Sequence, residues 1–240
     1  MPWFFAVAER DHQIQNPTSP EKIRALGEAL RLKQSSRVLD VACGKGGPAL
    51  ILAREFGCHV TGVERAPEFA AAARERVRST GLDERIEIVE QDAQDFRPEA
   101  GAYEVAMCLG ASFVWDGLVG TLAALAPAVR PGGHVVVGEP YWRKSPLPPH
   151  VEDDGFVTLS ETVARFDSAQ LALVTLIASN EDDWDNYESL HWRALEEWLA
   201  ENPDDPDAPE IRVRHEHSRA RYLEFQRELL GWAIFVARKR

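Results

Sequence analysis

The sequence predicts an α/β fold built on a doubly wound, mostly parallel sheet, and three observations support it. A short apolar strand, residues 37–42, runs into a glycine-rich turn and then into a helix over residues 47–56. Apolar runs typical of buried strands then alternate with helical patterns as far as residue 138. Strands that alternate with helices form parallel sheets with right-handed crossovers.

The glycine-rich turn is the feature around which the rest of the chain is organised. Gly44, Gly46 and Gly47 follow the strand, and Pro48 stands in the first turn of the helix, where its missing N–H is tolerated. Glycine lets a ligand come within contact distance of the backbone, and a helix start offers it unpaired N–H groups. The turn therefore predicts a cofactor cradle at the carboxyl end of the strand.

The other elements follow from periodicity and from turn residues. A helix is expected from Ser19 as N-cap and Pro20, with Ile23, Leu26 and Leu30 on its apolar face. The expected strands cover residues 37–42, 59–63, 85–90, 103–109, 134–138, 171–178 and 232–237. The further expected helices cover residues 47–56, 67–80, 115–130, 159–168, 182–201 and 210–229.

Length and composition fit one domain over residues 1–240. Hydrophobic residues make up 45% of the chain and charged residues 28%, an ordinary globular mixture. We expect residues 1–18 to form an N-terminal cap segment and residues 180–230 to form a helical insertion or lid between the sixth and last strands. That insertion is rich in aromatic residues, which suits a lid or a substrate wall.

Charge and cysteine usage narrow the class of partner. The net charge of −12 and a pI near 5.1 argue against a nucleic acid partner. Cys43, Cys58 and Cys108 are odd in number, so we interpret them as reduced thiols of a cytoplasmic protein. The apolar start, residues 1–7, is too short to span a bilayer, and no membrane partner is expected.

Two acidic residues stand where the second and third expected strands end. Glu64 follows the glycine turn by about 20 positions, the spacing at which a carboxylate accepts hydrogen bonds from both hydroxyls of a ribose. A lone glutamate at a loop is usually only solvated, but the strand and the glycines before it favour the ribose role. Asp92 is placed to accept from the exocyclic amine of an adenine.

Together these segments resemble a known family. Val38 to Gly46 resembles motif I of the class I S-adenosylmethionine-dependent methyltransferases. The family's further motifs are matched in order by Glu64, Asp92-Ala93, Tyr103 to Ala111 and Val129 to Gly133. The overall pattern is similar to the quinone and amine methyltransferases. The resemblance implies a Rossmann-like seven-stranded sheet with an antiparallel last strand, S-adenosylmethionine as cofactor and a small-molecule acceptor.

The resemblance also implies a role for each matched residue. Asp40, Ala42 and Gly44, with Gly46 in the same turn, would hold the amino-acid end of the cofactor. Glu64, with Arg65 beside it, would bind the ribose. Asp92 and Ala93 would meet the adenine, and Leu109 would offer its backbone carbonyl to the amino group.

The acceptor side is less defined by the sequence. Methyl transfer mainly requires alignment in a dry pocket, and a general base is needed only when the acceptor must lose a proton. Residues considered for a base are His12, Glu139 and Tyr141. A substrate wall is expected from Trp142, Trp184, Tyr187 and His191, although each could instead pack helices onto the core.

The sequence also bears on a metal site and on two other function classes. His215 and His217 do not form a metal pair on a helix, because residues two apart do not face each other, and no metal is expected. Gly44 to Ala49 also satisfies G-x-G-x-x-A, so a nicotinamide- or flavin-dependent oxidoreductase is an alternative. A non-catalytic S-adenosylmethionine-binding protein is another, because fold alone does not imply function. The oligomeric state is left open.

Overall fold

A computed structural model describes residues 3–240 as a seven-stranded sheet in the order β3-β2-β1-β4-β5-β7-β6. Strands β1 to β5 pair in parallel, and β7 runs antiparallel to both β5 and β6, which confirms the predicted sheet. The strands are β1 Arg37–Val41, β2 His59–Glu64, β3 Ile86–Glu90, β4 Tyr103–Leu109, β5 Val129–Trp142, β6 Leu171–Ala178 and β7 Leu230–Lys239.

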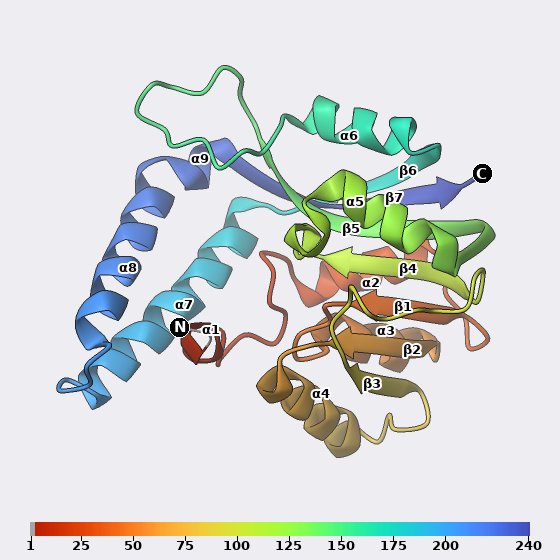
Figure 1. Ribbon diagram of the computed structural model, residues 1–240, viewed down its shortest axis with the longest axis horizontal. Coiled ribbons are helices and arrows are strands. Elements are labelled where there is room, and N and C mark those ends of the chain that lie inside the picture. The colour runs from red at the N-terminus through yellow and green to blue at the C-terminus, as the bar shows by residue number, and fades with distance from the viewer. Residues whose placement is uncertain (1–2) are drawn as a thin grey trace.

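Helices cover both faces of the sheet (Figure 1). On one face α2 and α3 pack against alternate strand residues such as Val38 and Val105, and Val77 of α4 joins them. On the other face α5 and α6 pack against Leu39 and Phe235. The helices are α1 Trp3–Ala8, α2 Pro20–Ala29, α3 Gly47–Phe56, α4 Pro67–Thr80, α5 Leu118–Leu125, α6 Leu159–Ser168, α7 Glu181–Glu201, α8 Ala208–Arg221 and α9 Arg227–Leu229.

The start of α2 follows the predicted capping chemistry. The side chain of Ser19 accepts a hydrogen bond from the backbone N–H of Lys22, and Pro20 occupies the first helical position. Ile23 and Leu26 are fully buried against the sheet. This helix therefore leads the chain directly from the N-terminal segment, residues 3–18, into the core.

The predicted boundaries around β5 were wrong. The helix expected over residues 115–130 is a 3₁₀ turn, Ser112–Trp115, followed by α5 and a second short 3₁₀ turn. Strand β5 already begins at Val129, which pairs with Tyr103. It also continues beyond Glu139 to Trp142, because the antiparallel β7 supplies pairing partners as far as Leu230.

A helical layer lies beyond the carboxyl ends of the parallel strands. Between β6 and β7 the chain forms α7, α8, a π-helical turn over Tyr222–Gln226 and α9, so the predicted second helix is interrupted by the π turn. The arrow of β4 points toward this layer, and α1 lies against α7 (Figure 1). Among residues 3–240, no helix is both long and apolar enough to span a membrane.

Candidate functional site

The carboxylate of Glu64 joins the end of β2 to the glycine turn after β1. Its two oxygens accept hydrogen bonds from the backbone N–H groups of Gly44, at 2.9 Å, and Ala66, at 2.8 Å. A carboxylate has about four acceptor positions, so two remain for the hydroxyls of a ligand. Two predicted cofactor residues, Gly44 and Glu64, are thus brought together, and the Glu64 side chain is held in one orientation.

Asp40 is a buried acid with an acceptor atom left over. Its side chain is 2% exposed, and its Oδ2 has no hydrogen-bond partner among the described residues. Burial, with a further contribution from the negative charge of Glu64, raises the pKa of Asp40 to about 8. An unpartnered buried carboxyl of this kind requires a donor, and a cationic group would satisfy it best.

The turn between Asp40 and α3 exposes bare backbone. Ala42, Gly44 and Gly46 all have positive φ angles, at 54°, 54° and 71°. The left-handed conformation is uncommon for residues with a Cβ, so Ala42 is a strained position of the sort found at ligand sites. Cys43 is buried against Gly62, and burial raises the pKa of its thiol, as expected of a packing residue.

The next strand ends extend the site along the sheet edge. Arg65 Nη1 lies 3.7 Å from Asp92 Oδ2 in an ion pair, and Asp92 Oδ1 accepts from the backbone N–H of Gln94. Ala93 is half-buried beside them, and Leu109 ends β4 as a buried residue. All nine predicted cofactor residues therefore lie at, or immediately after, the carboxyl ends of β1, β2, β3 and β4.

The N-terminal segment, which was expected to form a cap, covers this edge through contacts that no local signal in the sequence indicated. Gln15 Oε1 accepts a hydrogen bond from the backbone N–H of Lys45 at 2.7 Å. A Cβ added to Gly44 would lie 2.1 Å from that oxygen, and one added to Gly110 would lie 2.0 Å from Asn16 Oδ1. The turn Asn16-Pro17 was visible in the sequence, but nothing local indicated which part of the fold it contacts.

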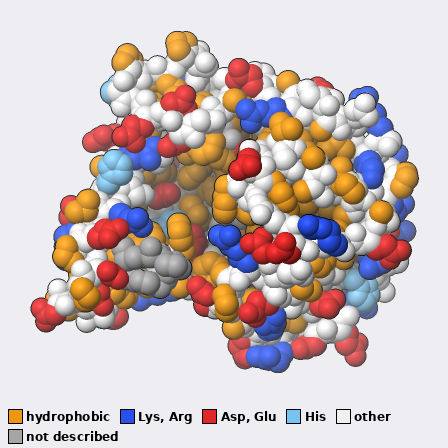
Figure 2. Space-filling view, in the orientation of Figure 1, with side chains coloured by type: hydrophobic (Ala, Val, Ile, Leu, Met, Phe, Trp, Pro, Cys, Tyr) orange, Lys and Arg blue, Asp and Glu red, His pale blue; other side chains and the backbone are white. Residues whose placement is uncertain are grey.

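A cavity of about 260 Å³ lies between the N-terminal segment and α7. Its lining includes His12, Asn16, Thr18, Tyr187 and Leu190. Because Asn16 also contacts Gly110, the cavity borders the end of β4. Figure 2 shows the molecule hollowed between the helical layer and the sheet, with hydrophobic side chains gathered along the hollow.

A larger cavity, of about 530 Å³, lies elsewhere. It is lined by Arg37, His59 and Tyr103, which begin their strands, and by residues 83–87. These residues mark the amino ends of the parallel strands, opposite to Asp40 and Glu64. Because ligands of open α/β sheets bind at the carboxyl ends, we give the smaller cavity the greater weight.

The three residues considered as a base are all constrained. His12 is 2% exposed; its Nε2 lies 2.9 Å from the carbonyl oxygen of Tyr187, and its Nδ1 lies 3.3 Å from Glu9 Oε2. Burial lowers the pKa of His12 and raises that of Glu139. Tyr141 packs edge-on against Phe235 in the core. Contrary to expectation, Glu139 and Tyr141 lie within β5 rather than after it.

The predicted substrate wall is only partly assembled. Tyr187 lines the cavity, whereas His191 is not among its lining residues and contacts Glu9 instead. Trp142 instead donates to Asp153 and packs near Phe156. Trp184 lies in the core and contacts the rings of Tyr222 and Tyr187. It therefore packs α7 onto the core, which was the alternative to its predicted place in the substrate wall.

Comparison with known proteins agrees with this geometry. Residues 38–133 match a family model described as a methyltransferase domain. A methyltransferase from Thiobacillus denitrificans, solved in complex with S-adenosyl-L-homocysteine, superposes with a TM-score of 0.93 at 34% identity, covering 100% of this chain and 99% of that one. The chain belongs to the class I S-adenosylmethionine-dependent methyltransferases.

Two further relatives of this methyltransferase differ in how far they match. The YjhP protein of Escherichia coli is 33% identical over 98% of both chains, and its crystal structure gives a TM-score of 0.93. A sterol 4-C-methyltransferase of Caenorhabditis elegans is 30% identical over 47% of this chain and 33% of its own. The full-length matches therefore include the helical layer, whereas the sterol enzyme shares only part of the chain.

The cofactor is S-adenosylmethionine, and the residues present fit it. Oδ2 of Asp40 lacks a partner, as a carboxylate awaiting an ammonium group would. The glycine turn presents backbone without side chains, and Glu64 retains free acceptor positions. The nicotinamide alternative has no comparable support, because the same glycine pattern lies here within a methyltransferase domain.

Proposed function

We propose that this enzyme transfers a methyl group to a compact small-molecule acceptor that binds in the 260 Å³ cavity between the N-terminal segment and α7. The observation that supports this assignment is the position of Asn16. One residue both lines the cavity and contacts Gly110 beside the cofactor edge, so an acceptor in the cavity lies next to the cofactor.

The cofactor roles follow from the strand ends. Asp40, Ala42, Gly44 and Gly46 hold the amino-acid end, with the backbone carbonyl of Leu109 accepting from its amino group. Glu64 binds the ribose hydroxyls, since its carboxylate is already oriented by two backbone N–H groups. Asp92 and Ala93 contact the adenine, and Arg65 is held beside it by its ion pair with Asp92.

The protein's contribution to the reaction is alignment and exclusion of water. When bound, the cofactor supplies an electrophilic methyl group on a positively charged sulfur. Lys45 Nζ donates to the backbone carbonyls of Glu9 and Arg10, at 2.6 and 3.0 Å, and the backbone N–H of Lys45 donates to Gln15. These three hydrogen bonds hold the N-terminal segment over the glycine turn. Positioning in such a site accounts for much of the barrier reduction in an in-line displacement.

The cavity also limits the acceptor. Binding pockets for drug-sized ligands are typically about 300–1,000 Å³, so a cavity of about 260 Å³ favours an acceptor smaller than a sterol. The lining of the cavity includes the polar residues Asp11, His12, Asn16 and Asn186 as well as the apolar Ile14 and Leu190. We therefore expect a compact acceptor with at least one polar group, despite the sterol substrate of the partial relative.

The test is a screen of small acceptors with S-adenosylmethionine labelled in the methyl group. The parent protein should label at least one compact polar acceptor, and sterols should remain unlabelled. Labelling of sterols alone, or no labelling of any small molecule by a protein that binds cofactor, would contradict the proposal. The second outcome would favour the non-catalytic alternative.

Glu64→Gln tests the cofactor side of the same proposal. Losing a charge-assisted hydrogen-bond acceptor costs about 1.5–3 kcal/mol, so S-adenosylhomocysteine should bind about 10- to 150-fold more weakly by calorimetry. Glu99→Gln, which makes the same change at an exposed position, should bind as the parent does. Equal affinities for both variants would contradict the assignment of Glu64 as a cofactor-binding residue.

A further inference from the structure

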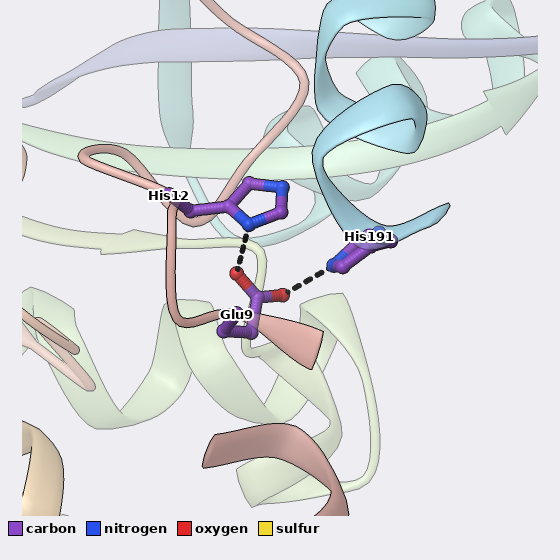
Figure 3. A group of neighbouring side chains, drawn as sticks. All are labelled: Glu9, His12 and His191. Atoms are coloured by element: carbon purple, nitrogen blue, oxygen red, sulfur yellow. Dashed lines mark hydrogen bonds and ion pairs between the residues drawn. The ribbon is translucent and has the colours of Figure 1, made fainter. Parts of the chain in front are cut away.

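Three side chains with metal-binding chemistry meet where the N-terminal segment contacts α7. Glu9 and His12 follow α1, whereas His191 lies on α7, 182 positions from Glu9. One ligand atom from each lies within 4.8 Å of the other two, and Glu9 and His12 are buried. Figure 3 shows both histidine rings directed at the Glu9 carboxylate, one on each oxygen.

The hydrogen bonds fix which atoms face each other. His12 Nε2 lies 2.9 Å from the carbonyl oxygen of Tyr187, and because a carbonyl only accepts, this nitrogen bears the proton. In the neutral ring, Nδ1 then presents a lone pair toward Glu9 Oε2, 3.3 Å away. Both atoms are buried and neither has a hydrogen-bond partner, so two acceptors face each other without a donor between them.

A cation between these atoms resolves the conflict. Ligands about 2.0–2.2 Å from one metal ion lie roughly 3.0–3.5 Å from each other, a range that includes the 3.3 Å between His12 Nδ1 and Glu9 Oε2. His191 Nε2 donates a hydrogen bond to Glu9 Oε1 at 2.9 Å, so its proton moves to Nδ1 when this nitrogen binds the ion. The hydrogen bond from His12 Nε2 to a backbone carbonyl is the outer contact that metal-binding histidines usually make. Tyr187 donates to Glu9 Oε1 at 3.2 Å and orients the carboxylate in the same way.

We propose that Glu9, His12 and His191 bind one divalent transition metal ion, which links the N-terminal segment to α7. Two imidazoles and one carboxylate suit Zn²⁺ and its first-row neighbours, whereas Mg²⁺ and Ca²⁺ prefer oxygen ligands alone. Three protein ligands leave a coordination position open. His12 and Tyr187 also line the 260 Å³ cavity, so the ion would lie at the wall of that cavity. Metal binding does not depend on the methyl acceptor proposed above.

Calorimetry with Zn²⁺ on the chelator-treated full chain tests this site. The parent should bind one ion per chain, and His191→Gln should bind at least about 100-fold more weakly, because even outer-shell losses cost 10–100-fold. His217→Gln provides a matched control, since His217 is an exposed histidine on α8. Equal Zn²⁺ affinity in the parent and in a folded His191→Gln protein would overturn the proposal.

Crystals of the parent soaked in Zn²⁺ give a test that needs no variant to fold. An anomalous difference peak within bonding distance of Glu9, His12 and His191 would support the assignment. No peak there at saturating Zn²⁺, or a peak only at exposed histidines such as His150 or His217, would contradict it. A structure with Zn²⁺ bound at the cluster should also retain the hydrogen bond from His12 Nε2 to Tyr187.

Discussion

Gln15 Oε1 accepts a hydrogen bond from the backbone N–H of Lys45 at 2.7 Å, which places the N-terminal segment directly over the glycine turn. The contact satisfies one of the N–H groups that the turn would otherwise leave unpaired. The hydrogen bond joins the cofactor edge of the sheet to the N-terminal segment, which lines the proposed acceptor cavity. The cofactor site and the acceptor site are therefore directly connected.

Gln15→Ala should weaken cofactor binding because it removes this link. A single hydrogen bond contributes about 0.5–1.5 kcal/mol, so the dissociation constant of S-adenosylhomocysteine should rise about 2- to 12-fold. Calorimetry measures the change, with Gln34→Ala, at an exposed position before β1, as the control. Identical affinities would show that the segment is only a neighbour of the site. Deletion of residues 1–18 should have a larger effect.

Gly44→Ala should disturb the site, whereas Gly81→Ala should not. Both glycines have positive φ, at 54° and 67°, so each alanine costs about 1–2 kcal/mol of stability. Only at Gly44 would the new Cβ meet Gln15, because nothing lies within 4 Å of one at Gly81. The melting temperature should fall in both variants, and further in Gly44→Ala because its Cβ would lie 2.1 Å from Gln15 Oε1. Only Gly44→Ala should lose affinity for S-adenosylhomocysteine. Equal affinities would argue against close contact at the turn.

The stability of the cofactor-free protein should depend on the ionisation of Asp40. The pKa of Asp40 is about 8 in the folded chain, against an ordinary value of 3.8. Between these values the folded protein binds more protons than the unfolded chain, so stability falls as pH rises from about 4 to about 8. Asp40→Asn does not titrate, so its stability relative to the parent should increase over that range.

Melting temperatures from pH 5 to pH 8 measure this difference. Asp204→Asn, an exposed aspartate in the loop between α7 and α8, should follow the parent at every pH. If the Asp40→Asn curve also ran parallel to that of the parent, the buried carboxyl would not be the titrating group. An offset that is constant with pH would reflect only the packing of the amide.

Leu190→Trp should block the proposed acceptor cavity without touching the cofactor edge. Leu190 lies on α7 and lines the cavity, so a larger ring would fill part of its 260 Å³. For an acceptor found in the screen, kcat/KM should fall at least about 10-fold, while the affinity for S-adenosylhomocysteine stays unchanged. Leu223→Trp, at an exposed leucine, is the control. Unchanged kcat/KM would place the acceptor elsewhere.

Local sequence signals predicted much of the fold. The strand over residues 103–109, the helix over 159–168 and the strand over 171–178 were predicted with the boundaries that the structure has. Each is bounded by turn or cap residues, which act within a few positions. The ends of β5 could not be predicted in this way, because its start at Val129 depends on pairing with Tyr103 of β4 and its end at Trp142 on pairing with Leu230 of β7, about 90 positions further along the chain.

The same division applies to the site. Asp40 and Glu64 were found because they stand at strand ends beside a glycine turn, which is a local pattern. The contacts of Gln15 with Lys45, and of Glu9 with His191, join segments far apart in the sequence, and neither had a local signal. Tyr141 and Trp184 were considered for the site on residue type, which does not distinguish a pocket wall from a packed core.

The central claim is that the carboxyl ends of β1, β2 and β3 hold one elongated cofactor beneath the N-terminal segment. A crystal structure of this protein with S-adenosylhomocysteine tests it most directly. We expect both ribose hydroxyls within hydrogen-bond distance of Glu64, the adenine beside Asp92, and the amino group near Asp40, with Gln15 still over the turn. A complex in which Glu64 and Asp92 point away from the ligand would contradict the account.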